Sequence, residues 1–207
     1  MSLIGPPRGT APGAASEAAA PIPPDAEADR LAARDLPLVE AATSGDREAF
    51  GHLYDLYGRM VHGVLLSRVP REEVDDLVQD VFIQAMERLN TLREPGAFGG
   101  WLAAIARNRA TDYYRKPATR ASHVEWSELP EAVMATQESV SEKTQAIAVL
   151  NVIRTMPEAY RETLVLRLVE GMTGPEIAAR TGLTPASVRV NLHRGMKQLR
   201  EKLEGRS

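Results

Sequence analysis

The stretch that decides the fold is residues 173–203, TGPEIAARTGLTPASVRVNLHRGMKQLREKL. It opens as a capping box, with Thr173 as the expected N-cap, a proline in the first turn and Glu176 three residues later. Gly182 then permits a sharp turn, and Thr184 caps a second helix with proline in its first position. Two helices joined by a short glycine turn predict a helix-turn-helix.

The outward side of the second helix carries polar and basic groups that suit a DNA major groove. These candidate residues are Ser187, Arg189, Val190, His193, Arg194 and Lys197. An ordinary solvated face is the alternative, because most charge stripes on helices have no other role. The coincidence of caps, turn glycine and basic face favours DNA binding.

A second group of helical patterns precedes this motif. Apolar residues recur every three or four positions, which places them on one face of a helix and predicts a packed core. In the first of these helices they are Phe50, Leu53, Tyr54, Tyr57, Val61 and Leu65. The next helix begins near Arg71 and carries a polar stripe opposite its apolar face. That stripe consists of Asp76, Gln79, Asp80 and Ile83.

A loop and a third helix follow. Pro95 and several glycines over residues 90–100 predict the loop, and the helix then runs from about Trp101 to Lys116, where Pro117 ends it. We expect Trp101 to pack in the core rather than stack on a base. The opposite side of this helix is basic and polar, and it carries Arg107, Asn108, Arg109, Asp112, Arg115 and Lys116.

The formal net charge of −3 argues against nucleic-acid binding when it is taken alone. Its distribution reverses that impression. Residues 99–123 hold five basic side chains against one acid, and residues 150–207 hold ten against six. Between them, residues 124–142 carry five glutamates and no lysine or arginine. The order of charges along the chain therefore indicates two basic modules separated by an acidic strip.

These patterns predict an all-α fold of two small helical domains joined by a flexible linker. The expected boundaries are a disordered Ala/Pro-rich tail over 1–33, a first domain over 34–117, an acidic linker over 118–143 and a second domain over 144–207. No secretory signal and no apolar run of about 20 residues is found, so we expect a cytoplasmic protein without membrane insertion.

Enzymatic chemistry has little support in the sequence. The chain contains no cysteine, which excludes disulfides and thiolate metal sites within it. The four histidines, His52, His62, His123 and His193, do not have the spacing of metal ligands, and no nucleophile has a base placed beside it. We expect no metal, no cofactor and no catalytic residue.

The order of the modules resembles a known family. Residues 156–203 closely resemble region 4 of the extracytoplasmic-function (ECF, group IV) sigma factors of the bacterial sigma-70 family. The segment EVDDLVQDVFIQAMERL, residues 73–89, followed by FGGWLAAIARNRATDYYRK, residues 98–116, resembles region 2 of the same family. The resemblance implies an alternative sigma factor that binds core RNA polymerase and directs promoter recognition, promoter melting and transcription initiation.

The resemblance also implies residue roles. Asp76, Gln79, Asp80 and Ile83 would dock on the clamp of the largest polymerase subunit. Leu92, Ile105 and Asn108 match a pocket that holds a flipped base of the minus-10 element, and Thr111, Asp112, Arg115 and Lys116 would lie along the DNA just upstream. Asp112 is expected to be a helix-surface group or a base-edge contact. Ser187, Arg189, Val190, His193, Arg194 and Lys197 would read the minus-35 element.

Further partners follow from the resemblance. They are the flap of the second-largest polymerase subunit, promoter DNA and an anti-sigma factor. One departure concerns specificity: many relatives have Ser-Arg where this chain has Val190 and Asn191, and an apolar Val190 suits a thymine methyl group. The acidic strip either mimics nucleic acid in the RNA-exit path or acts as a tether that repels DNA.

Two other functions are compatible with parts of the pattern. A stand-alone helix-turn-helix transcription regulator would bind its operator unaided, whereas a sigma factor needs core enzyme. A protein-interaction adaptor would keep its activity after the charges of Arg189 and Arg194 are reversed.

Overall fold

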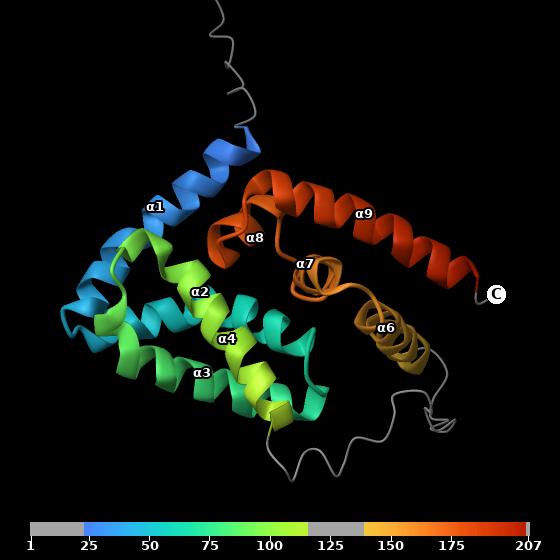
Figure 1. The fold of residues 1–207 in the computed structure, drawn as a ribbon, viewed down its shortest axis with the longest axis horizontal. Helices are drawn as coiled ribbons and strands as arrows, with labels where there is room; N and C mark the ends of the chain where they lie inside the picture. The colour runs from blue at the N-terminus through green and yellow to red at the C-terminus, as the bar shows by residue number, and fades with distance from the viewer. Residues whose placement is uncertain (1–22, 116–138, 206–207) are drawn as a thin grey trace, which may run out of the picture.

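The protein is described here by a computed structural model of residues 23–115 and 139–205, in which every regular element is helical (Figure 1). The all-α prediction is confirmed. The first module contains α1 (Pro24–Thr43), α2 (Arg47–Leu66), α3 (Val74–Arg88) and α4 (Phe98–Arg115), with 3-10 turns at Arg71–Glu73, Leu89–Thr91 and Pro95–Ala97. The second contains α6 (Ser139–Arg154), α7 (Glu158–Leu168), α8 (Gly174–Thr181) and α9 (Pro185–Glu204).

Helix α2 is the centre of the first module and packs against α1, α3 and α4. Its start is fixed by Asp46, whose carboxylate accepts hydrogen bonds from the backbone N–H groups of Glu48 and Ala49. Its predicted apolar face is buried at Leu53, Tyr57, Val61 and Leu65, whereas Phe50 is half-buried and Tyr54 is 42% exposed. Tyr54 lies at the edge of the face, where its ring contacts that of Phe82.

Two helices begin earlier than composition suggests. Helix α1 starts at Pro24, inside the expected tail, and α6 starts at Ser139, inside the expected linker. Alanine is a strong helix former, proline suits the first turn of a helix, and burial of Ala28 adds packing that composition does not reveal. The rest of both segments, residues 1–22 and 116–138, lies outside the described residues.

The helix-turn-helix has the predicted caps. The Thr173 hydroxyl accepts the N–H of Glu176 at 3.3 Å, and the Glu176 carboxylate accepts the N–H of Thr173 at 2.7 Å. Gly182 ends α8 in the left-handed region, with φ of 74°. The Thr184 hydroxyl then accepts the N–H of Ser187 at 3.2 Å, which starts α9. These local interactions fix the angle between α8 and α9.

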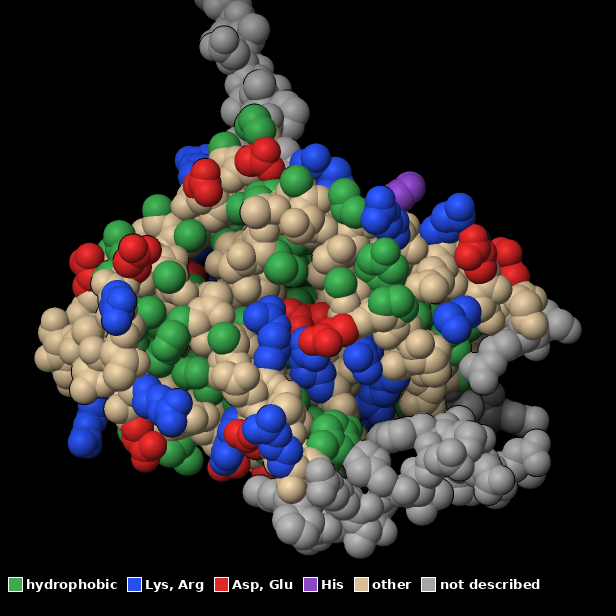
Figure 2. Space-filling model, viewed as in Figure 1, with side chains coloured by type: hydrophobic (Ala, Val, Ile, Leu, Met, Phe, Trp, Pro, Cys, Tyr) green, Lys and Arg blue, Asp and Glu red, His purple; other side chains and the backbone are tan. Residues whose placement is uncertain are grey.

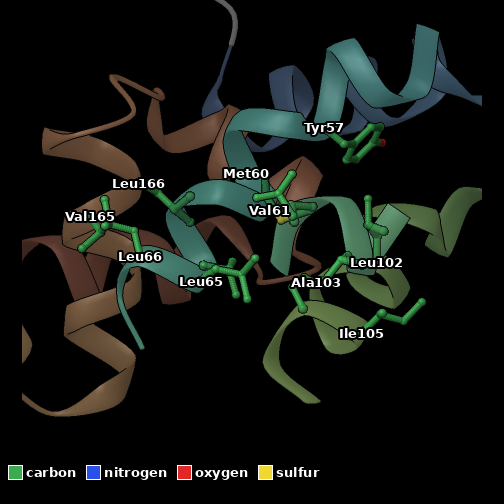
Figure 3. Packing of buried hydrophobic residues seen from close by; sticks show 14 of the residues in the cluster. Tyr57, Met60, Val61, Leu65, Leu66, Leu102, Ala103, Ile105, Val165 and Leu166 are labelled. Carbon is green, nitrogen blue, oxygen red and sulfur yellow. The ribbon is translucent and has the colours of Figure 1, made fainter. Parts of the chain in front are cut away.

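The two modules pack directly on each other. Helix α8 contacts α1, α2 and α4, and α7 contacts α2 (Figure 1). One cluster of buried apolar side chains runs through both modules. Figure 3 shows part of it, with Val165 and Leu166 of α7 near Leu65 and Leu66 of α2. In this arrangement the modules share a core.

A buried carboxylate joins the modules beside this core. Glu162 of α7 is 5% exposed and accepts hydrogen bonds from Arg68 at 2.6 Å and from Arg107 at 2.7 and 3.1 Å. Arg154 adds a second link, because its guanidinium donates to the carbonyl oxygens of Leu66 and Val69 at the end of α2. The carboxylate of Glu162, buried between the modules, is thus paired with two guanidinium groups.

We predict that Glu162→Ala lowers the free energy of unfolding by about 3–5 kcal/mol, because it leaves two guanidinium groups without their shared carboxylate. Glu158→Ala is the matched control: Glu158 is on the same helix and binds the same Arg68, but its side chain is 63% exposed. Its loss should cost less than about 1 kcal/mol. Urea unfolding measures both values, and equal losses would contradict the assigned role of Glu162.

Candidate nucleic-acid and protein interfaces

The predicted DNA-reading face of α9 is exposed along its length. All six candidate residues lie at the surface, and Val190 is 44% exposed. They are Ser187, Arg189, Val190, His193, Arg194 and Lys197. Figure 2 shows lysine and arginine side chains along the edge of the molecule that α9 forms. Packing of the modules leaves this face free to approach DNA.

Two members of this face also have local partners. The Ser187 hydroxyl lies 2.8 Å from the hydroxyl of its N-cap Thr184, and the Lys197 ammonium lies 4.0 Å from Glu201. The first contact fixes the side chain of Ser187 at the start of α9. The second is an exposed helix-surface pair, which is weak and leaves Lys197 available to a phosphate.

The candidate clamp-binding stripe lies on α3. Asp76, Gln79 and Ile83 are exposed, and the exposed fraction of Ile83 is 53%. Asp80 differs, because its carboxylate pairs with the guanidinium of Arg109 on α4. The structure therefore gives Asp80 a role in joining α3 to α4, whatever it does at an interface.

The candidate minus-10 residues fall into two groups. Leu92 is half-buried and Ile105 is 7% exposed, and both belong to the packed core of the first module. Asn108, Thr111, Asp112 and Arg115 are exposed along α4. Lys116 lies outside the described residues. The two apolar residues therefore lie within the packed first module, whereas the polar residues of α4 lie on its surface.

Local contacts clarify two further residues of α4. Arg115 lies 3.7 Å from Asp112, which suits the expectation that Asp112 is a helix-surface group. Trp101 packs against the core, with its ring centroid 5.8 Å from that of Phe98. Packing of Trp101, rather than base stacking, was the predicted arrangement.

Sequence patterns did not indicate the residues that join the modules. Burial acts to raise the pKa of Glu162, but hydrogen bonds and charges of Arg107 and Arg68 outweigh it and hold the pKa below its usual value. Glu162 therefore stays ionised. The sequence placed Arg107 on the basic, polar side of α4. Its partner, Glu162, became apparent only from the packing of α7 against that side.

A histidine contact lies at the other edge of the junction. The Nδ1 atom of His62 is 2.6 Å from the Glu170 carboxylate, and its Nε2 atom is 4.0 Å from Asp75. The hydrogen bond with Glu170 raises the pKa of His62, and burial opposes this shift. A hollow of about 520 Å³ adjoins this contact and is bordered by Gln79 of the candidate stripe.

A second hollow, of about 590 Å³, lies between α7 and α9. Its apolar lining includes Leu168 and Met196, which are 45% and 39% exposed. Its basic lining includes Arg167, Lys197 and Arg200. An apolar floor with a basic edge suits a partner helix that has an apolar face and acidic flanks.

Within residues 23–115 and 139–205, no cluster of three His, Cys, Asp or Glu side chains is arranged to hold a metal ion. None of the helices in the same residues has the length and apolar character needed to cross a membrane.

Comparison with known proteins assigns the two modules. Sigma-70 region 2 matches residues 53–120, and Sigma-70 region 4 matches residues 146–199. The ECF RNA polymerase sigma-E factor of Escherichia coli K12 is 31% identical over 182 residues, covering 82% of this chain and 94% of the relative. The chain belongs to the ECF sigma factors of the sigma-70 family.

Other relatives agree with this assignment. The ECF RNA polymerase sigma factor BldN of Streptomyces coelicolor is 30% identical to this sigma factor over 176 residues, covering 83% of this chain and 67% of BldN. The solved structure of CnrH in complex with the cytosolic domain of CnrY has 27% identity and a TM-score of 0.56, and it covers 84% of this chain and 99% of that one. This protein is thus an alternative sigma factor that directs transcription initiation.

We predict that this sigma factor loses stability as the pH rises above about 6.5, the ordinary pKa of histidine. The folded pKa of His62 is raised, so its contribution is complete below the unfolded pKa and is lost as the pH passes the folded pKa. His62→Gln should flatten the slope of unfolding free energy above about pH 6.5, whereas His193→Gln, at an exposed position, should keep it. An unchanged slope in His62→Gln would contradict the assignment.

Proposed function

We propose that this ECF sigma factor binds core RNA polymerase mainly through α3 and reads two promoter elements with α4 and α9. The observation that carries the proposal is that its three candidate surfaces differ in chemistry. The α3 stripe mixes acids with an exposed isoleucine, α9 is basic, and α4 adds polar groups to a buried apolar pair. Each chemistry suits a different partner.

The α3 stripe is the proposed clamp contact. An apolar side chain amid carboxylates and an amide is typical of a protein interface, because the isoleucine gains from burial and the polar groups orient the partner. Asp76, Gln79 and Ile83 are free to make such a contact. Asp80 would contribute while keeping Arg109 in place.

The α9 face is the proposed minus-35 reader. Arg189, Arg194 and Lys197 supply charges for phosphates and donors for base edges, and Val190 supplies an apolar contact for a thymine methyl. Thr184 and Ser187 hold the start of this helix, which is the part that enters a major groove in this motif.

The α4 surface is the proposed minus-10 reader. Asn108 offers an amide to a base edge, and Arg115 and Lys116 offer charge to the backbone upstream. Leu92 and Ile105 would form the apolar wall for a flipped base, which requires their packing to loosen when DNA binds. Strand separation is driven by capture of unstacked bases, and this chain supplies no catalytic group.

Further partners follow from the relatives. CnrH is found with the cytosolic domain of CnrY, and we propose that an anti-sigma factor similarly holds this chain inactive. The hollow between α7 and α9 is the proposed contact of the polymerase flap. The protein acts where the polymerase is, in the cytoplasm. A stand-alone regulator is disfavoured, because it has no need of a Sigma-70 region 2.

Run-off transcription with core polymerase tests the α9 assignment. We predict that the double variant Arg189→Glu, Arg194→Glu loses promoter-specific transcripts by at least about 100-fold, because two phosphate or base contacts become repulsive. Lys202→Glu, on the same helix but outside the candidate face, should change transcription by less than about threefold. Full activity of the double variant would contradict DNA reading by α9.

The clamp assignment has its own matched pair. Ile83 and Met86 are both apolar residues of α3, and they are 53% and 54% exposed. We predict that Ile83→Lys weakens binding to core polymerase by about tenfold or more, whereas Met86→Lys does not. Titration of labelled protein with core enzyme gives both affinities. Similar affinities for the two variants would place the clamp contact elsewhere.

A further inference from the structure

Helix α1 lies outside both family matches, which begin at residues 53 and 146. It nevertheless packs against both modules, on α2 of region 2 and on α8 of region 4 (Figure 1). One face of α1 is buried at intervals of three, four or seven residues. The buried residues are Ala28, Asp35, Val39 and Ala42.

Charged and aromatic groups of the three helices lie together at the middle of this face. Asp35 of α1 is 5% exposed, and burial together with the nearby charge of Asp35 raises the pKa of the Tyr57 hydroxyl on α2. The guanidinium of Arg180 on α8 lies over the Tyr57 ring, 5.1 Å from its centroid. The cation of region 4 therefore stacks on a ring of region 2, and the buried Asp35 of α1 lies near that ring.

The opposite side of α8 is enclosed by α4. A Cβ atom on Gly99 would lie 2.7 Å from the carbonyl oxygen of Arg180, and a Cβ atom on Gly100 would lie 3.3 Å from the Cα atom of Gly182. Backbones approach this closely only where both helices lack bulk. Helix α8 is thus held between α1 and α4, with α2 contacting it as well.

This position of α8 limits the distance between the candidate DNA-reading surfaces of α4 and α9. Asp112 lies about 18 Å along α4 from Gly100, and His193 lies about 21 Å from Gly182 through the turn and α9. These two lengths, together with the short gap between the contacting glycines, place Asp112 and His193 at most about 45 Å apart. The minus-35 and minus-10 elements are about 25 base pairs apart, or about 85 Å of B-DNA. The packed arrangement therefore cannot read both elements together.

We propose that the first part of α1, residues Pro24–Asp35, is an autoinhibitory strap that holds region 4 on region 2 until core polymerase separates them. The inference rests on the proposed function, since it assumes that α4 and α9 read the two elements. Asp35 and Ala28 are the buried residues of the strap. Release of α8 from the strap frees region 4 to move to the minus-35 position.

Fluorescence energy transfer in the full-length chain tests the strap. The chain has no cysteine, so Arg71→Cys and Val169→Cys place two dyes on either side of the His62–Glu170 contact, at exposed positions of the two modules. In this background, Ala28→Glu should raise the population with low transfer on the order of tenfold, because a carboxylate is expelled from a packed contact. Ala33→Glu, on the exposed side of α1, should leave transfer unchanged.

Arg180→Ala tests the same contact from region 4 and leaves α1 unaltered. It should raise the low-transfer population about two- to fivefold, through loss of the contact between cation and ring. Circular dichroism shows whether each variant remains helical. The proposal is overturned if the free wild-type protein already has low transfer, or if helical Ala28→Glu and Arg180→Ala both match Ala33→Glu.

A transcription assay separates this inference from the function on which it rests. If wild-type protein and core enzyme give no promoter-specific transcript, the proposed assignment of the surfaces fails, whatever the transfer values. If transcripts form and the strap variants do not change transfer, only the strap fails. Faster initiation by Ala28→Glu than by Ala33→Glu at limiting core enzyme supports both.

Discussion

The arrangement of the whole molecule depends on the carboxylate of Glu162, which is buried and shared by Arg68 of α2 and Arg107 of α4. A carboxylate in this environment is tolerated only when it is paired, so α7 is held where both guanidinium groups reach it. With α7 in place, α8 enters the space between α1 and α4, and α9 presents its basic face outward. The position of the candidate DNA-reading helix thus follows from an ion cluster that lies outside that helix.

Much of the fold was predictable because its signals are local. The capping box at Thr173, the left-handed Gly182 and the cap at Thr184 each depend on residues within a few positions, and all three have the predicted geometry. The core position of Trp101 followed from its place in the region 2 pattern. Composition was a poorer guide at Pro24, because an alanine-rich segment forms a helix once a neighbour buries one of its faces.

The junction between the modules was not predictable in the same way. Arg107 and Glu162 are 55 residues apart, and their pairing depends on how two separately patterned bundles dock. Asp80 was assigned to a partner surface from the resemblance to region 2, and its pairing with Arg109, 29 residues away, needed the packing of α3 on α4. Periodicity shows which face of a helix is polar, whereas only the tertiary structure shows which charged side chains form ion pairs. The roles of the candidate residues toward polymerase and DNA stay predictions.

We expect this sigma factor to have two arrangements, a packed one in which the modules satisfy each other's charges and an open one that spans a promoter. Core polymerase shifts this equilibrium only if it binds the open arrangement more tightly. Covalent closure is the most direct test: Arg71→Cys and Val169→Cys joined by a short, cleavable bifunctional maleimide would lock the modules together. We predict that the locked protein gives no promoter-specific transcript with core enzyme and that cleavage of the linker restores transcription. Equal transcription by the locked and cleaved proteins would contradict the claim that the two modules must separate.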